Sequence, residues 1–92
     1  MSATTYFTRK EELSYEGKSR LVEETTIADV DGGEFALSAL SLIGDATSGL
    51  VDLDDLVSFA KAEGLEDLEE VFVAETKREN LDSTDYEVFI SY

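Results

Sequence analysis

Acidic residues crowd the stretch from Asp52 to Glu70, which holds eight carboxylates and a single base, Lys61. Within it a leucine–acid–acid–leucine pattern occurs twice, at 53–56 and again at 65–68. Leucines three residues apart share one face of a helix, so the acids between them are expected to point outward. Carboxylates in this arrangement could hold a hard cation, perform general acid–base catalysis or bind a basic partner.

The residue inventory excludes most catalytic chemistry. The chain contains neither histidine nor cysteine, so it lacks the commonest general base, the usual zinc ligand and any thiolate. A glycosidase-like pair needs one buried carboxyl with a raised pKa beside another that stays ionised, and no acid in the sequence is marked as buried. We therefore expect a non-enzymatic protein without a cofactor.

Two glycine-kinked acidic segments superficially resemble the calcium-binding loop of an EF-hand. That loop needs oxygen ligands at positions 1, 3 and 5 and a glycine at position 6. Setting Gly49 at position 6 places Gly44 and Ala46 at ligand positions. Setting Gly32 at position 6 places Ile27 at position 1. Because both frames fail, we expect no metal site.

Alternating side-chain character predicts a β-hairpin at the start of the chain. The two strands cover 4–13 and 20–28, and Gly17 supplies the positive φ of the loop between them. The second strand is expected to place Leu21, Glu23, Thr25 and Ile27 on one face and Val22, Glu24, Thr26 and Ala28 on the other.

A nearly uncharged run predicts a buried helix over 34–43, started by Asp31 or Gly33 and ended by Gly44. Helical spacing gives it a wide apolar face: Phe35, Ala36, Ala39, Leu40 and Ile43, widened by Leu37 and Leu42.

A polar turn is expected at 45–49, and a second helix then begins at Asp52 as its N-cap. Asp55 at the third helical position complements the helix dipole. Gly64 followed by Leu65 is typical of a Schellman ending. The buried side chains of this helix should be Leu53, Leu56, Val57 and Ala60.

The segment after the acidic stretch allows two interpretations. The Val-Phe-Val run favours a third strand over 71–78, whereas Leu68, Val71 and Phe72 also fit a helix over 66–79. We take the strand as the prediction and expect a last strand over 85–92. The fold is then α+β in a single domain, 1–92: a four-stranded antiparallel sheet, with elements in the order ββααββ and two helices packed on one face. One face of the last strand should carry Tyr86, Val88, Ile90 and Tyr92.

Charge indicates what kind of partner the chain meets. The net charge is −15, and residues 29–70 contribute −11 of it. Such a surface repels phosphate, so we expect no direct binding to nucleic acid and instead a basic protein partner. Acids three or four positions apart on a helix lie about 5–6 Å from each other, which suits a row that imitates the phosphates of a nucleic acid.

In size, charge and lack of catalytic residues, the chain is similar in profile to small phage proteins that block restriction or CRISPR complexes. The likeness implies an inhibitor that engages a basic nucleic-acid-binding protein through a phosphate-mimicking surface. We expect the partner-binding residues to be Asp54, Asp55, Glu63, Glu66, Asp67, Glu69 and Glu70.

The alternative is a small interaction or regulatory module from a salt-adapted, halophilic host, in which charge serves solubility. The C-terminal segment Tyr86–Tyr92 lacks basic gatekeepers, so at a sheet edge it would pair with a copy of itself and form a homodimer. In a central position the same residues would simply be core.

The longest mostly apolar run, 35–43, falls far short of the roughly 20 residues that span a bilayer. The first residues show no secretory signal either. We expect a cytoplasmic protein without a membrane partner, located in the host cytoplasm if it is phage-encoded.

Overall fold

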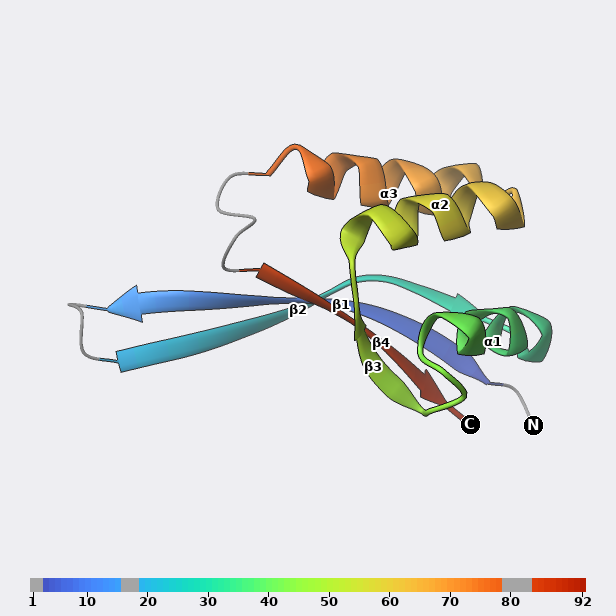
Figure 1. Ribbon diagram of the computed structural model, residues 1–92, viewed down its shortest axis with the longest axis horizontal. Coiled ribbons are helices and arrows are strands. Elements are labelled where there is room, and N and C mark those ends of the chain that lie inside the picture. The colour runs from blue at the N-terminus through green and yellow to red at the C-terminus, as the bar shows by residue number, and fades with distance from the viewer. Residues whose placement is uncertain (1–2, 16–18, 79–83) are drawn as a thin grey trace.

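The computed structural model describes residues 3–15, 19–78 and 84–92, and its main feature is a four-stranded antiparallel sheet (Figure 1). The strand order is β2-β1-β4-β3, so β2 and β3 form the two edges. This confirms the predicted α+β class. The strands are β1 (Thr4–Tyr15), β2 (Ser19–Asp31), β3 (Ser48–Val51) and β4 (Thr84–Ser91). The predicted loop residue Gly17 and the predicted loop at 79–83 lie outside the described residues.

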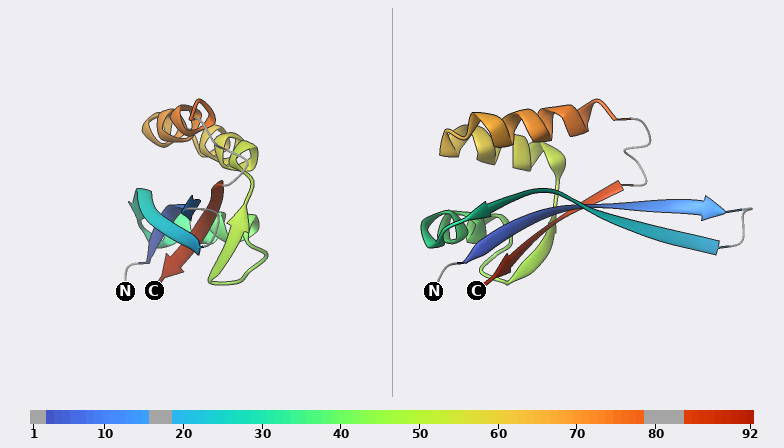
Figure 2. Two further views of the ribbon diagram at one scale, coloured as in Figure 1. Left: turned by 90° about the vertical axis from the view of Figure 1, so that its left-hand side faces the viewer. Right: turned by 180° about the vertical axis from the view of Figure 1, so that it is seen from behind.

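The helices pack on one face of this sheet, where α2 and α3 form an antiparallel helical hairpin (Figures 1 and 2). Apolar residues from both helices meet β1 and β4 in the main core, whose fully buried members include Phe7, Leu56, Phe72 and Val88. The helical elements are α1 (Gly33–Ala39), a short 3-10 turn η1 (Leu40–Leu42), α2 (Leu53–Glu63) and α3 (Glu66–Thr76).

The predicted third strand at 71–78 is wrong, because this segment continues helix α3 from Glu66 to Thr76. The helical alternative fits better since Leu68, Phe72 and Glu75 are buried at helical spacing, whereas a strand would have split them between two faces. Acids in the first turn of α3 also favour a helix, because they complement its dipole. Local β propensity was overridden by the spacing of the buried side chains.

The third strand is β3, which occupies part of the predicted polar turn at 45–49 and extends to Val51. The order of elements is therefore ββαβααβ, with helices on both sides of β3, and not ββααββ. A four-residue strand gives little periodic signal, and the pairing is tertiary: Gly49 lies opposite Val88 and Leu50 opposite Glu87. Gly49 also passes so close to Ile43 that an added Cβ would lie 3.1 Å from its Cγ2 atom.

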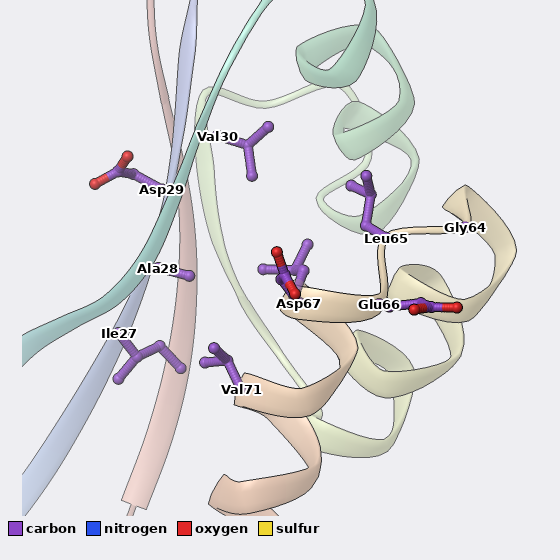
Figure 3. Close-up of a pocket in the computed structure, with 10 residues that line it drawn as sticks. Ile27, Ala28, Asp29, Val30, Gly64, Leu65, Glu66, Asp67 and Val71 are labelled. Atoms are coloured by element: carbon purple, nitrogen blue, oxygen red, sulfur yellow. The ribbon is translucent and has the colours of Figure 1, made fainter.

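A β-bulge in β2 changes the predicted alternation of that strand. Phe7 pairs with Ala28 and Thr8 pairs with Thr26, so Ile27 is the extra residue. Ile27 and Ala28, predicted on opposite faces, both pack against the core side, together with Val30. Figure 3 shows these side chains pointing toward the helices while Asp29 points away. The bulge therefore adds one more apolar side chain to the helix-covered face.

Helix α1 is shorter and less buried than predicted. It begins after Gly32 and gives way to η1 at Leu40, and Ile43 rather than Gly44 caps that turn. Ala36 and Ala39 are buried against Ala3 and Ile90, but Leu37 is 70% exposed, so it does not widen the buried face. Phe35 links this end to the main core through edge-on contacts with the Phe7 and Phe59 rings.

Strand β4 is an interior strand, which removes the premise of the predicted self-pairing through Tyr86–Tyr92. It pairs with β1 on one side and with β3 on the other. Tyr86, Val88 and Ile90 are buried on one face as predicted, whereas Tyr92 is 67% exposed. Because backbone groups of β4 are already bonded to two neighbours, they are not available to a second copy.

Helix α2 follows its prediction closely. The helix starts directly after Asp52, whose backbone is extended. Leu56 and Ala60 are buried, and Leu53 and Val57 pack beside them. The Gly64 N–H donates to the Lys61 carbonyl and the Leu65 N–H to the Ala60 carbonyl, which is the Schellman pattern.

Gly64 provides a test of this ending. Its φ of 71° is left-handed, and an added Cβ would meet no atom within 4 Å, so the cost of Gly64→Ala is backbone strain alone. We expect a loss of about 1–2 kcal/mol in the free energy of unfolding, measured by urea denaturation. Gly33→Ala is the matched control, because Gly33 lies inside helix α1 in equally open space without a positive φ. An equal loss in both variants would contradict the assignment.

Candidate functional site: the acidic helical hairpin

The seven predicted partner-binding acids all lie on the helical hairpin, at the surface of the molecule. Glu69 is half-buried and the other six are exposed. Because α2 and α3 run antiparallel, the first acids of α2 and the first acids of α3 lie at opposite ends of the hairpin (Figure 1). A rise of about 1.5 Å per residue separates Asp54 from Glu63 by roughly 13 Å along α2. The acids therefore do not form one continuous row.

One group lies where α2 begins. Asp54 and Asp55 line a hollow of about 790 Å³ together with Asp52, before the helix, and Asp85, from the start of β4. Sequence reasoning assigned Asp52 to capping alone and did not include Asp85, because the two belong to segments that only the sheet brings together. The group unites four carboxylates from two segments of the chain, 52–55 and the start of β4.

A second group follows the outer side of α3. Glu66, Glu69 and Glu70 recur at intervals of three and four residues, so they share one helical face. The same face continues with Val73 and ends at Lys77. This is the part of the site that matches the predicted phosphate-like row, and it covers about one helical turn.

A third group surrounds a groove between β2 and the start of α3. Glu66 and Asp67 from α3 and Asp29 from β2 line a hollow of about 620 Å³, and the Asp29 side chain points away from α3 (Figure 3). Glu63, at the end of α2, borders none of the three hollows. This groove was not predicted from the sequence, because the expected second strand ends at 28, before Asp29, and no prediction says which strand flanks α3.

In the part of the chain that the structure describes, the ion pairs lie on the sheet and at the end of α3. Among the described residues, none of the seven hairpin acids forms an ion pair, and neither does Asp29 or Asp85. The Lys10 ammonium instead bridges Glu24 and Glu87 on the helix-free face of the sheet, at 3.4 and 3.0 Å. Lys61, in the last turn of α2, and Lys77, at the end of the outer face of α3, also lie on the hairpin, but within the described ranges neither forms an ion pair with its acids.

On the helix-covered face, an ion-pair network joins β1 to the end of α3. The Arg9 guanidinium donates to both carboxylate oxygens of Glu75 at 3.0 Å and lies 2.6 Å from Glu11. Arg78 also pairs with Glu11 and approaches Glu75 at 3.8 Å. Burial acts to lower the pKa of Arg9, but the hydrogen bond and charge of Glu75 outweigh it and raise that pKa. This network is a structural clamp.

Tyr86 completes the clamp from β4. Its hydroxyl donates a hydrogen bond of 2.9 Å to Glu75 Oε1. The pKa of Tyr86 is raised well above its ordinary value, first because burial disfavours the phenolate, and then because Glu75 accepts its hydrogen bond and would repel its negative charge. The interaction therefore depends on a protonated tyrosine facing an ionised carboxylate.

The described part of the chain offers no arrangement of three or more acids that could hold a metal ion. Within the same residues, no helix has the length and apolar character needed to cross a bilayer.

Comparison with known proteins gives no match: no protein-family model, no curated protein and no solved structure is significantly similar to this chain.

The clamp predicts a particular dependence of stability on pH. Tyr86→Phe removes the hydrogen bond to Glu75 and should lower the free energy of unfolding at pH 7 by about 1.5–3 kcal/mol. Because the folded state raises the pKa of Tyr86, the native protein should lose stability as the pH rises above about 10, where the unfolded tyrosine ionises. The Tyr86→Phe variant should lack the part of this loss of stability at high pH that comes from ionisation of Tyr86. Guanidinium denaturation at pH 7 and pH 11 measures both effects.

Tyr6→Phe is the control for this experiment. Tyr6 lies on the opposite face of the sheet against Phe89, and its hydroxyl bonds to no described residue. If both variants lose the same stability and keep the same alkaline slope, Tyr86 does not hold the clamp.

Proposed function

We propose that this chain is a non-enzymatic binding protein whose acidic helical hairpin engages a basic, nucleic-acid-binding protein and blocks it. The observation that carries the proposal is the separation of charge: Arg9, Lys10 and Arg78 pair with acids of the sheet and with Glu75. The hairpin acids have no such partners among the described residues. Unpaired surface carboxylates attract a basic surface and speed its encounter.

The outer face of α3 is the part of the site best suited to imitate phosphates. Glu66, Glu69 and Glu70 lie on one helical turn, where neighbouring side chains are about 5–6 Å apart. Asp54 and Asp55 form a separate acidic surface at the far end of the hairpin, beside Asp52 and Asp85. A basic channel would therefore meet at least two acidic surfaces, each contacting a different part of it.

One observation favours the alternative, in which acidity serves solubility in a salt-adapted host. Exposed acids also occur away from the hairpin, at Asp31 on β2, Glu34 on α1 and Asp45 in the following turn. Charge spread over many surfaces is expected of a protein adapted to high salt. Two experiments distinguish these functions.

The first experiment tests the acidic surface directly. The immobilised chain is first used at low ionic strength to retain proteins from a host lysate. The affinity of the main retained protein is then measured for the wild-type chain and for two variants of it. Glu69→Lys with Glu70→Lys should weaken binding about tenfold or more, and the wild-type affinity should fall steeply with added salt. Adding the chain should also weaken the binding of the purified partner to nucleic acid.

The matched control reverses two acids elsewhere, Glu23→Lys with Glu34→Lys, which are both exposed and lie outside the hairpin. It makes the same change in net charge. Equal loss of binding in the two double variants would show that overall charge and not the hairpin drives association, and unchanged binding in both would refute the proposal.

The second experiment follows thermal unfolding as KCl is increased. For a binding protein, we expect a cooperative transition in dilute buffer and a modest rise in Tm as salt screens self-repulsion. That rise should level off by roughly 1 M salt, where the screening length is only about 3 Å. A Tm that keeps climbing steeply into molar KCl would favour the salt-adapted alternative.

A further inference from the structure

The groove between β2 and α3 exposes apolar surface that the core leaves incompletely covered. Ile27 and Val30 on β2 face Leu65 and Val71 across it, and all four are half-buried. Leu68, which is 6% exposed, closes the floor. Figure 3 shows the apolar β2 side chains Ile27, Ala28 and Val30 pointing toward α3, with the groove lying between the strand and the helix. Its volume of about 620 Å³ lies within the range of sites that take a few large side chains.

The strand that forms one wall of the groove is an edge strand. β2 pairs only with β1, and residues 27–30 form no other backbone hydrogen bond with the described residues. Alternate N–H and C=O groups on its outer side are thus free to pair with an added strand. Residues 27–30 extend over roughly 13 Å, which is enough to pair with a short extended segment.

The rim of the groove is acidic. Asp29, Glu66 and Asp67 are exposed and, among the described residues, have no basic partner. Because side chains alternate along an extended segment, those next to its apolar side chains would lie on the opposite face of β2, where lysine or arginine would meet Asp29. Glu66 and Asp67 add negative charge on the α3 side of the groove. A second copy of this chain is a poor occupant, because it would bring two acidic rims together.

We propose that this groove binds an extended segment of the basic partner, in which aliphatic side chains alternate with lysine or arginine and whose backbone adds to the free edge of β2. This inference rests on the proposed function, since it specifies which chemical groups of the basic partner are bound. Charge on α3 attracts the partner, and the groove selects for an apolar side chain at a fixed distance from a base.

The test uses two fluorescein-labelled heptapeptides and the full chain. In one peptide lysine alternates with leucine, and in the other serine replaces each leucine. The leucine peptide should bind roughly tenfold more tightly in fluorescence anisotropy, because it buries apolar side chains that the serine peptide lacks. Binding should shift the amide resonances of 27–30 and 65–71 in preference to those of 52–55.

Two lysine substitutions in α3 provide a matched pair. Val71→Lys places a charge in the groove, and Val73→Lys makes the same change at a half-buried valine on the outer face of the same helix. We expect Val71→Lys to abolish the preference for the leucine peptide and Val73→Lys to retain it, with circular dichroism confirming that both variants fold. If Val71→Lys does not fold, the amide resonance shifts of the wild-type chain show whether the leucine peptide binds in the groove.

Equal binding of both peptides, or no binding of either, overturns the groove as a binding site. So does an equal response to the two lysine substitutions. A concentration-dependent dimer that Val71→Lys dissociates would assign the groove to a second copy and also overturn the proposal. The proposed function fails by a different result, namely an intact partner affinity in the Glu69→Lys, Glu70→Lys variant.

Discussion

The position of the helical hairpin on the sheet depends on one buried carboxylate, Glu75 of α3. Only 11% of its side chain is exposed, and its carboxylate oxygens keep hydrogen-bond partners there because Arg9 from β1 and the Tyr86 hydroxyl from β4 both donate to them. Breaking one side of such a buried pair typically costs about 3–5 kcal/mol, a large part of the total stability of a small domain. Because the three groups come from three elements, the clamp fixes where the end of α3 lies over the sheet.

The clamp also explains how the charge of the molecule is distributed. Arg9 and Arg78 form ion pairs with Glu75 and Glu11, and Lys10 forms an ion pair with Glu87 on the opposite face of the sheet. These three bases therefore help hold the sheet and the end of α3 together, and the seven acids of the hairpin form no ion pair among the described residues. One distribution of ion pairs thus stabilises the fold and leaves the acids of the hairpin outside it, where the proposed basic partner would bind.

The groove arises from a related geometric cause. The bulge at Ile27 adds an apolar side chain to the helix-covered face of β2, at the edge of the sheet. The start of α3 lies beside this edge and covers it only in part. Apolar surface, a free strand edge and the acids of the first turn of α3 consequently meet in one place, where a partner could be held by shape as well as by charge.

The sequence by itself determined the α+β class, the initial hairpin, the bounds of α2 and the buried face of β4, since each is encoded by spacing within one segment. It also placed the seven acids that we expect to bind a partner on or near helices. Only the tertiary structure decided that 71–76 is helical, that β3 completes the sheet and that β4 lies inside it, because pairing and burial between distant segments outweigh local propensity. The same holds for the site: the sequence contains its charges, and the antiparallel hairpin and the bulge divide them into separate surfaces.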